Sequence, residues 1–360
     1  MLGSLFSFLQ AIASPIIGRA SDMFGRRRVL LWCMCGNVVS VTLWCFAVEF
    51  RIFLLSRIVG GLSEGNVQLA TAIATDISTH EERASTMALV GVCFSVAFIL
   101  GPALGATLAS VSTFSANPFA TAAGGSLALI VAETLYLYLC LPETAPIKSS
   151  VLDRQADEVQ VHLMQGSKKN HTNPPYVLNL IHLVFLLAFS GMEFSLPFLI
   201  TSILYPTHPA PAKINGRLLG FIGLIAAVLQ GSVVRRLTPL VVVRSGVVSA
   251  TLAFVLLAQV QSTVGLYCAA ALLAITSSTV VTGLNSLASF ESGKDNRGEI
   301  LGALRSWGQL GRALGPLLFC TLFWGAGRES AYVTGSAVML GVALIVFVVL
   351  KPPKRASAST

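Results

Sequence analysis

Long apolar runs alternate with short polar connections along the whole chain, and this pattern is its main structural signal. Most runs contain 18 or more residues, and about 20 apolar residues in a helix cross the hydrocarbon core of a bilayer. Because that core offers no water to the backbone, such spans must be helices. The pattern predicts an all-α polytopic membrane protein. The eleven apolar segments are 2–17, 29–48, 52–76, 84–109, 118–141, 177–204, 217–234, 239–260, 263–289, 298–325 and 331–350.

The composition agrees with a membrane location and argues against an enzyme. Of the 360 residues, 54% are hydrophobic and 11% are charged, whereas a soluble domain has about 25% charged residues. The seven cysteines form no C-x-x-C pair, so neither a zinc site nor a disulfide framework is expected. The sequence contains no P-loop and no catalytic or metal-ligand spacing. We therefore expect no enzymatic activity, no metal and no cofactor.

The basic residues fall unevenly on the two sets of connecting loops, and this predicts the orientation. One set, with the C-terminal tail, holds sixteen Lys and Arg residues, and the opposite set holds four: Arg51, Lys213, Arg217 and Arg328. Loops rich in Lys and Arg stay in the cytosol, so the first set and the C-terminus are predicted to be cytosolic. Clusters spread between apolar runs also make nucleic-acid binding an unlikely use for the net charge of +8. The sixteen residues are Arg19, Arg26, Arg27, Arg28, Arg83, Lys148, Arg154, Lys168, Lys169, Arg235, Arg236, Lys294, Arg297, Lys351, Lys354 and Arg355.

A polar stretch divides the chain into two predicted helical bundles. Residues 1–143 form the first bundle with five segments, 144–176 a cytosolic linker, 177–350 the second bundle with six segments, and 351–360 a cytosolic tail. A faint repeat joins the bundles. Arg83 and Arg297 are each followed by Leu-Gly-Pro at the same spacing, an offset of 214 residues (297 minus 83). The repeat favours two related halves, as in many transporters.

A basic motif, Gly18 to Arg28, connects the first two segments. Gly18 and Gly25 permit tight helix ends, and Asp22 can cap a following turn or accept from an arginine across an interface. The arginines Arg26 and Arg27, with Arg28, suit the anionic headgroup layer. A second connection is flanked by Asp76 and Arg83 and is predicted to complete the same charge network. Topology anchoring alone is the competing interpretation.

The order G-x-x-x-D-x-x-G-R-R in this motif resembles the signature loop of the major facilitator superfamily. The preceding LQAIASP (9–15), RIVGG (57–61) and the run 91–105 are similar to motifs of its drug:proton antiporter branch, and GLSEGNV (61–67) resembles the eukaryotic tetracycline-transporter-like, organic-anion group. The resemblance implies a monomer with two pseudo-symmetric bundles that exports organic anions or drugs in exchange for protons by alternating access. It also implies that Asp22 pairs with helix ends as a latch in the outward-facing state.

The family has twelve helices, and the motif follows one apolar segment here where two are expected. The first helix is therefore predicted to be missing, so that the chain has 11 of the usual 12 helices. An inactive truncated form, or a transporter-like scaffold or receptor that binds without translocating, is the alternative function. In either case we expect an integral multi-pass protein of the plasma membrane or an endomembrane.

Charged side chains inside apolar segments mark the candidate cavity. Six such charges would cost on the order of 15–20 kcal/mol if they faced lipid, so they are predicted to face a wet cavity or to pair with one another. Arg57 and Glu64 are expected two turns apart on one helix face. Asn66 is a further candidate for the cavity, or a hydrogen bond between helices, and His182 is expected at the membrane interface. The charges are Arg57, Glu64, Glu133, Glu193, Arg305 and Arg312.

Small residues and prolines mark helices that we expect to pack closely or to bend. Gly101 and Gly105 flank Pro102, and Gly315 precedes Pro316, so both copies of the repeat carry a Gly-Pro pair at the same position. Glycines four residues apart allow close helix contact, and proline bends a helix. Packing alone and controlled bending during alternating access remain the two interpretations.

Overall fold

The computed structural model describes residues 2–110, 120–144, 171–204, 211–293 and 295–353, and all regular secondary structure in these ranges is helical. Counting α3 with α4 and α8 with η1, the described helices make eleven passes, as predicted. The elements are α1 (Leu2–Phe24), α2 (Arg26–Cys45), α3 (Phe50–Ser63), α4 (Asn66–Ile77), α5 (Arg83–Ser110), α6 (Ala120–Cys140), α8 (Pro175–Phe198), η1 (Leu199–Leu204), α9 (Pro211–Ser232), η2 (Val234–Arg236), α10 (Pro239–Gln259), α11 (Thr263–Glu291), α12 (Arg297–Gly325) and α13 (Arg328–Val348).

Eight of these helices are long and apolar enough to cross a membrane by themselves. The other three passes are α1, the broken pair α3/α4, and α12. Each of the three carries charged residues, such as Asp22, Arg57 and Arg312. Charges within a span are tolerated only where neighbouring helices or a wet interior receive them, so these three passes are the place to look for a functional site.

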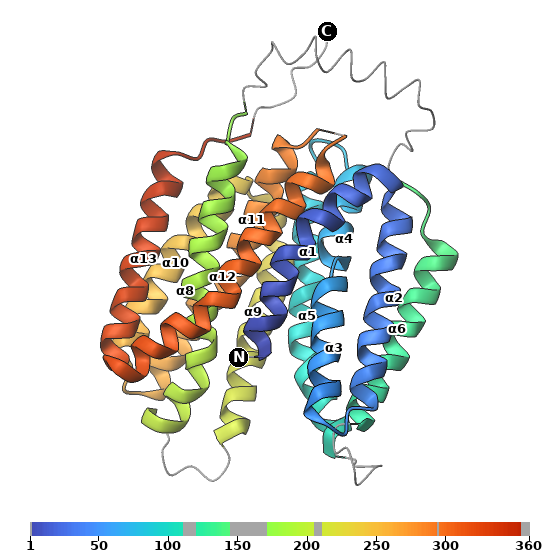
Figure 1. Ribbon diagram of the computed structural model, residues 1–360. Helices are drawn as coiled ribbons and strands as arrows, with labels where there is room; N and C mark the ends of the chain where they lie inside the picture. The colour runs from blue at the N-terminus through green and yellow to red at the C-terminus, as the bar shows by residue number, and fades with distance from the viewer. Residues whose placement is uncertain (1, 111–119, 145–170, 205–210, 294, 354–360) are drawn as a thin grey trace.

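The helices form two groups that meet along two seams (Figure 1). We call α1–α6 the N-terminal half and α8–α13 the C-terminal half. The halves meet where α1 packs against α12 and where α5 packs against α9. We call the end at which α1 finishes and α12 begins the basic side; it is at the top of Figure 1. The predicted linker lies outside the described residues from 145 to 170, and the predicted tail from 354 to 360.

The largest cluster of buried apolar residues lies mainly in the C-terminal half and includes an aromatic group. Phe254, Phe319 and Tyr332 lie with ring centroids 5.3 to 6.1 Å apart, and each is at most 6% exposed. The hydroxyl of Tyr332 meets that of Ser195 at 2.9 Å. A buried phenol needs such a partner. This rigid packing supports α12, which carries several of the charged residues described below.

Two predicted boundaries are wrong. The segment 52–76 is two helices, because the chain turns at Glu64 and Gly65, where the amide of Gly65 bonds the carbonyl oxygen of Ser63 at 2.8 Å. Arg57 and Glu64 therefore do not share one continuous helix face. The motif 18–28 is also mostly helical: α1 continues to Phe24 and only Gly25 is outside a helix. Gly18 is thus an interior helix position and does not end one.

The close helix contacts predicted at glycines are found in α12 but not in α5. A Cβ at Gly315 would overlap the carbonyl oxygen of Leu187, so α12 and α8 touch there. At Gly101 and Gly105, by contrast, no atom of the described residues lies within 4 Å of an added Cβ, so the expected close contact is absent from that part. The backbone of α5 stays helical through Pro102, and Pro316 lies inside α12. Helix bending at either proline remains a prediction.

Candidate functional site

The turn between α1 and α2 depends on a glycine and on a carboxylate from another helix. Gly25 has φ of 94°, a conformation that favours glycine. The carboxylate belongs to Glu143, which follows α6. It accepts hydrogen bonds from the amides of Arg26 at 2.7 Å and Arg27 at 3.2 Å. The carboxylate therefore caps the positive end of α2. The sequence did not point to Glu143, because its role depends on α6 ending beside this turn.

Arg26 is the buried centre of the motif, with 1% of its side chain exposed. Its guanidinium contacts Asp22 at 2.6 Å, Asp76 at 3.0 Å and the hydroxyl of Ser21 at 2.5 Å. Asp22 is on α1 and Asp76 on α4, so Arg26 joins three helices of the N-terminal half. A buried arginine with two carboxylates is stable only while both remain in place.

The same two carboxylates reach the C-terminal half. Asp76 pairs with Arg297, the first residue of α12, at 2.5 Å. Asp22 accepts hydrogen bonds from the backbone amides of Gly298 at 2.9 Å and Glu299 at 2.8 Å. These amides have no partner within their own helix, and the positive helix end attracts a carboxylate. The motif therefore caps a helix of the opposite half.

Arg83 makes a second crossing on the basic side. It is the first residue of α5, as Arg297 is of α12, and donates to the carbonyl oxygen of Ser289 at 3.1 Å. Its guanidinium also lies 5.7 Å from the ring centroid of Phe290. The two arginines of the sequence repeat thus both cross between the halves. We define the latch cluster as Asp22, Arg26, Asp76, Arg83 and Arg297, with the amides of Gly298 and Glu299.

Two residues of the basic motif, Arg27 and Gly18, are not part of the latch cluster. Arg27 donates to the carbonyl oxygen of Tyr138 at 2.5 Å and so ties α2 to α6 within one half. Gly18 lies against α12: a Cβ there would overlap the carbonyl oxygen of Gly298. Close backbone approach, which small residues allow, lets the Asp22 carboxylate reach the α12 amides.

One of the charge pairs expected within the membrane is formed. Glu193 of α8 and Arg312 of α12 lie 2.9 Å apart, with 30% and 39% of their side chains exposed. Pairing of all three carboxylates with the three arginines, one of the two predicted alternatives, is not found among the described residues, where Arg57, Arg305 and Glu133 make no ion pair; a wet cavity stays a prediction for these charges. Glu133 is exposed on α6.

Arg57 is surrounded by aromatic rings instead. Its guanidinium carbon lies 5.4 Å from the ring centroid of Phe6, 5.3 Å from Trp44 and 5.6 Å from Phe53. Cation–π contacts of this kind stabilise a charge away from water. Glu64 lies instead at the break between α3 and α4, beside Asn66 and within electrostatic range of Arg305 of the other half.

His182 is buried between α8 and α12 and is 4% exposed, so the expected interfacial position is wrong. Its Nδ1 lies 2.8 Å from the carbonyl oxygen of Leu304. The imidazole fits because Gly308 leaves room for it: a Cβ there would lie 2.5 Å from the ring. The second ring nitrogen, Nε2, has no hydrogen-bond partner among the described residues.

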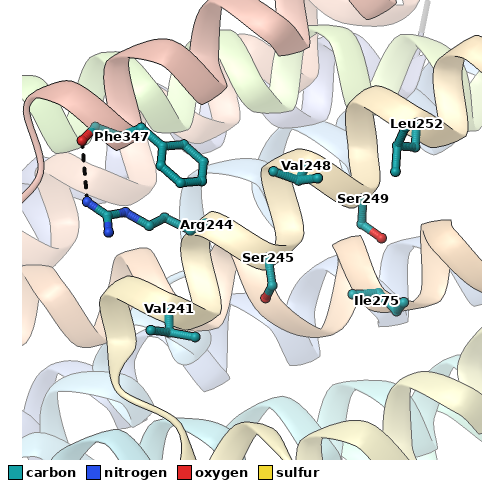
Figure 2. A pocket seen from close by; sticks show the side chains of 8 residues that line it. All are labelled: Val241, Arg244, Ser245, Val248, Ser249, Leu252, Ile275 and Phe347. Carbon is teal, nitrogen blue, oxygen red and sulfur yellow. Dashed lines mark hydrogen bonds between the residues drawn. The ribbon is translucent and has the colours of Figure 1, made fainter.

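One cavity in the C-terminal half is far from these charges. It has a volume of about 420 Å³ and lies between α10, α11 and α13 on the outer face of the C-terminal half (Figure 2). Its lining is mainly apolar, with two serines and, near one end, Arg244. The lining residues are Val241, Arg244, Ser245, Val248, Ser249, Leu252, Ile275 and Phe347.

Comparisons with known proteins agree with this architecture. The chain matches the family model described as Major Facilitator Superfamily over residues 1–316. It is 32% identical to Major facilitator superfamily domain-containing protein 10 of Mus musculus, with 94% of this chain and 76% of the relative covered. It is 25% identical to Tetracycline resistance protein, class D, of Salmonella ordonez, with 96% and 84% covered.

A solved structure is also similar. The crystal structure of the human organic anion transporter MFSD10 (TETRAN) matches with a TM-score of 0.83 at 30% identity, covering 96% of this chain and 82% of that chain. The predicted family and the all-α membrane fold are confirmed. The chain therefore belongs to the major facilitator superfamily, a family of multi-pass membrane transporters for small molecules and not of enzymes.

Proposed function

We propose that this chain transports organic anions or drugs by alternating access, with protons as the coupling ion and its basic side in the cytosol. The observation that carries the proposal is the distribution of contacts between the halves. Every side-chain hydrogen bond and ion pair between the halves, among the described residues, lies on the basic side or near mid-helix. Charged contacts of this kind can form and release repeatedly, which alternating access requires.

The substrate class rests on the relatives and on the paired charges. A relative of known structure is named an organic anion transporter, and Arg312 offers a guanidinium that is 39% exposed. An organic anion that contacts Arg312 competes with Glu193 for it. A cationic drug would instead contact Glu193 or Glu64. Arg57, held by aromatic rings, supports the wall of the N-terminal half.

The two kinds of solute lead to opposite proton movements. If an anion displaces Glu193 from Arg312, the freed carboxylate favours a proton, and solute and proton move together. If a cation replaces a proton on Glu193 or Glu64, solute and proton are exchanged, as the antiporter resemblance implies. A carboxylate can serve either scheme because it changes charge on proton binding.

The test is uptake into proteoliposomes of carboxyfluorescein, an organic anion, and of tetracycline, each under pH gradients of both signs. We expect a gradient of one sign to accelerate one solute. If that solute is carboxyfluorescein, Arg312→Ala should abolish the acceleration; if it is tetracycline, Glu193→Gln should abolish it. Arg328→Ala, which removes an arginine at the far end of the C-terminal half, is the matched control and should leave it unchanged. Uptake that ignores the gradient, with Arg57→Ala and Arg312→Ala both unchanged, would contradict proton coupling.

A further inference from the structure

The cavity on the outer face has the shape of a groove along α10. Val241, Ser245, Val248 and Leu252 recur at helical spacing and form one face of the helix. Val241 is 45%, Val248 41% and Leu252 51% exposed. In a membrane protein this face meets lipid, so the apolar wall suits a hydrocarbon chain. The volume of about 420 Å³ lies within the range typical of small-molecule sites.

A single arginine stands near one end of the groove (Figure 2). Arg244 donates from Nη2 to the carbonyl oxygen of Phe347 at 3.3 Å, and its guanidinium carbon lies 4.9 Å from the Phe347 ring centroid. Its Nε is buried without a hydrogen-bond partner among the described residues. The guanidinium is thus held in place by one hydrogen bond and a ring contact, and the other donors of its two Nη atoms are left to contact a ligand.

The position of Arg244 matches the level of a lipid headgroup. It lies five residues after Pro239, the start of α10, or about 7 Å by the rise of an α-helix. Phe347 is in the last turn of α13. Both helix ends lie on the basic side, and exposed Arg235, Arg236 and Lys351 adjoin them. Positive charge therefore gathers at the end of the groove that faces the membrane surface. The apolar wall of the groove extends from this end toward the hydrocarbon core.

We infer that this groove binds a phospholipid with an anionic headgroup, whose phosphate contacts Arg244 and whose acyl chain lies along Val248 and Leu252. Basic pockets between membrane helices near the surface bind anionic headgroups, and arginine suits phosphate through its planar set of donors. A free phosphate would use Arg244 but leave the apolar wall uncovered. The inference depends on the membrane location of the chain and not on the proposed substrates.

The test uses the full chain reconstituted in vesicles of equal parts phosphatidylcholine and phosphatidylserine. After gentle extraction, native mass spectrometry counts the phosphatidylserine molecules retained by each protein. We expect Arg244→Ala to lower retention about fivefold, the effect of one arginine near a charged surface. Arg328→Ala is the matched control, because Arg328 lies at the opposite end of α13. Like Arg244→Ala, it removes one positive charge and one hydrogen bond to a backbone carbonyl oxygen, here that of Val260. It should leave retention unchanged.

A second variant separates the groove from the charge. Leu252→Trp keeps Arg244 and fills the exposed wall, and it should also lower retention. The headgroup alone, glycerophosphoserine, should not compete. Equal retention in the native protein and Arg244→Ala, or an equal loss in Arg328→Ala, would overturn the inference. Competition by glycerophosphoserine would overturn it as well, because it would indicate an anion site without a lipid chain. Transport assays on the same variants keep this outcome distinct from failure of the proposed function.

Discussion

The two seams between the halves are counterparts in the repeat but are built differently. In the α1–α12 seam, Asp22 caps the first turn of α12 through two backbone amides. At the same offset in the α5–α9 seam, the position of Asp22 corresponds to Arg236, which is exposed. An arginine cannot cap a positive helix end. The second turn of α5 is met instead by apolar residues: Ala88 packs with Val234 and Val242.

The polar bonds of the seams differ in the same way. Asp76 joins Arg297 and Arg26 through charges that are at most 8% exposed. In the other seam Gln230 accepts from the hydroxyl of Ser95 at 2.6 Å and donates to the carbonyl oxygen of Ser278 at 3.2 Å. Buried charges are costly to unpair, whereas neutral hydrogen bonds contribute about 1 kcal/mol. We infer that the α1–α12 seam controls closure of the basic side and that the α5–α9 seam acts as a hinge.

Removing the shared carboxylate should have the largest effect. Asp76→Ala leaves Arg26 and Arg297 buried without this partner, which costs about 3–5 kcal/mol. Opening of the basic side should become at least a hundredfold more frequent, since about 1.4 kcal/mol is a factor of ten. Hydrogen exchange at the amides of Gly298 and Glu299, measured by mass spectrometry, reports that opening. Unchanged protection would show that the latch cluster does not hold the seam.

The second-largest effect is expected from crowding the close backbone contact between α1 and α12. Gly18→Ala places a methyl group against the carbonyl oxygen of Gly298, and overpacking of this kind costs about 1–3 kcal/mol. Exchange at Gly298 should rise about tenfold. Gly341→Ala is the matched control, because no described atom lies within 4 Å of a Cβ added there. Equal exchange in the two variants would mean that close approach of α1 and α12 is not required for the cap.

Breaking the second seam should have a smaller and more local effect. Gln230→Leu removes both neutral hydrogen bonds while keeping a similar volume, at a cost of about 1 kcal/mol. Exchange in α5 and α9 should rise about fivefold, with Gly298 and Glu299 unaffected. A larger rise at Gly298 than Asp76→Ala produces would reverse the assignment of the two seams.

The exposed ion pair should matter least. Arg19 and Glu299 lie 2.7 Å apart, but 68% and 44% of their side chains are exposed. Such pairs contribute about 0–1 kcal/mol and weaken in salt. Glu299→Gln should therefore change exchange at Gly298 less than threefold in low salt, about 0.6 kcal/mol, and not at all in high salt. A loss as large as that of Asp76→Ala would contradict burial as the cause of the difference.

The sequence predicted the features that depend on local pattern. Apolar length located the eleven passes, and the two charged connections predicted one charge network, in which Asp22 and Asp76 both contact Arg26. Features that depend on distant helices were missed. Glu143 caps α2 only because α6 ends nearby, and Arg57 meets aromatic rings because α1, α2 and α3 converge there.

The break at Glu64 and Gly65 was missed for a related reason. Glycine inside an apolar run is compatible with a continuous helix, so the run alone did not predict a turn. Contacts explain why it occurs here: a Cβ at Gly65 would lie 2.7 Å from Ile17 and 2.8 Å from the sulfur of Cys33. The turn brings the backbone close to both α1 and α2, and neither neighbour is visible in the local sequence.

The most direct test of the account measures separation of the halves on the basic side. Spin labels at Met23→Cys and Arg236→Cys, in a chain whose seven native cysteines are replaced, lie on opposite halves at exposed positions. Pulsed electron paramagnetic resonance then gives the distance between them. We predict one short distance in the resting protein, an added longer one during transport, and the longer one without solute in Asp76→Ala. A single unchanged distance under all three conditions would contradict the account.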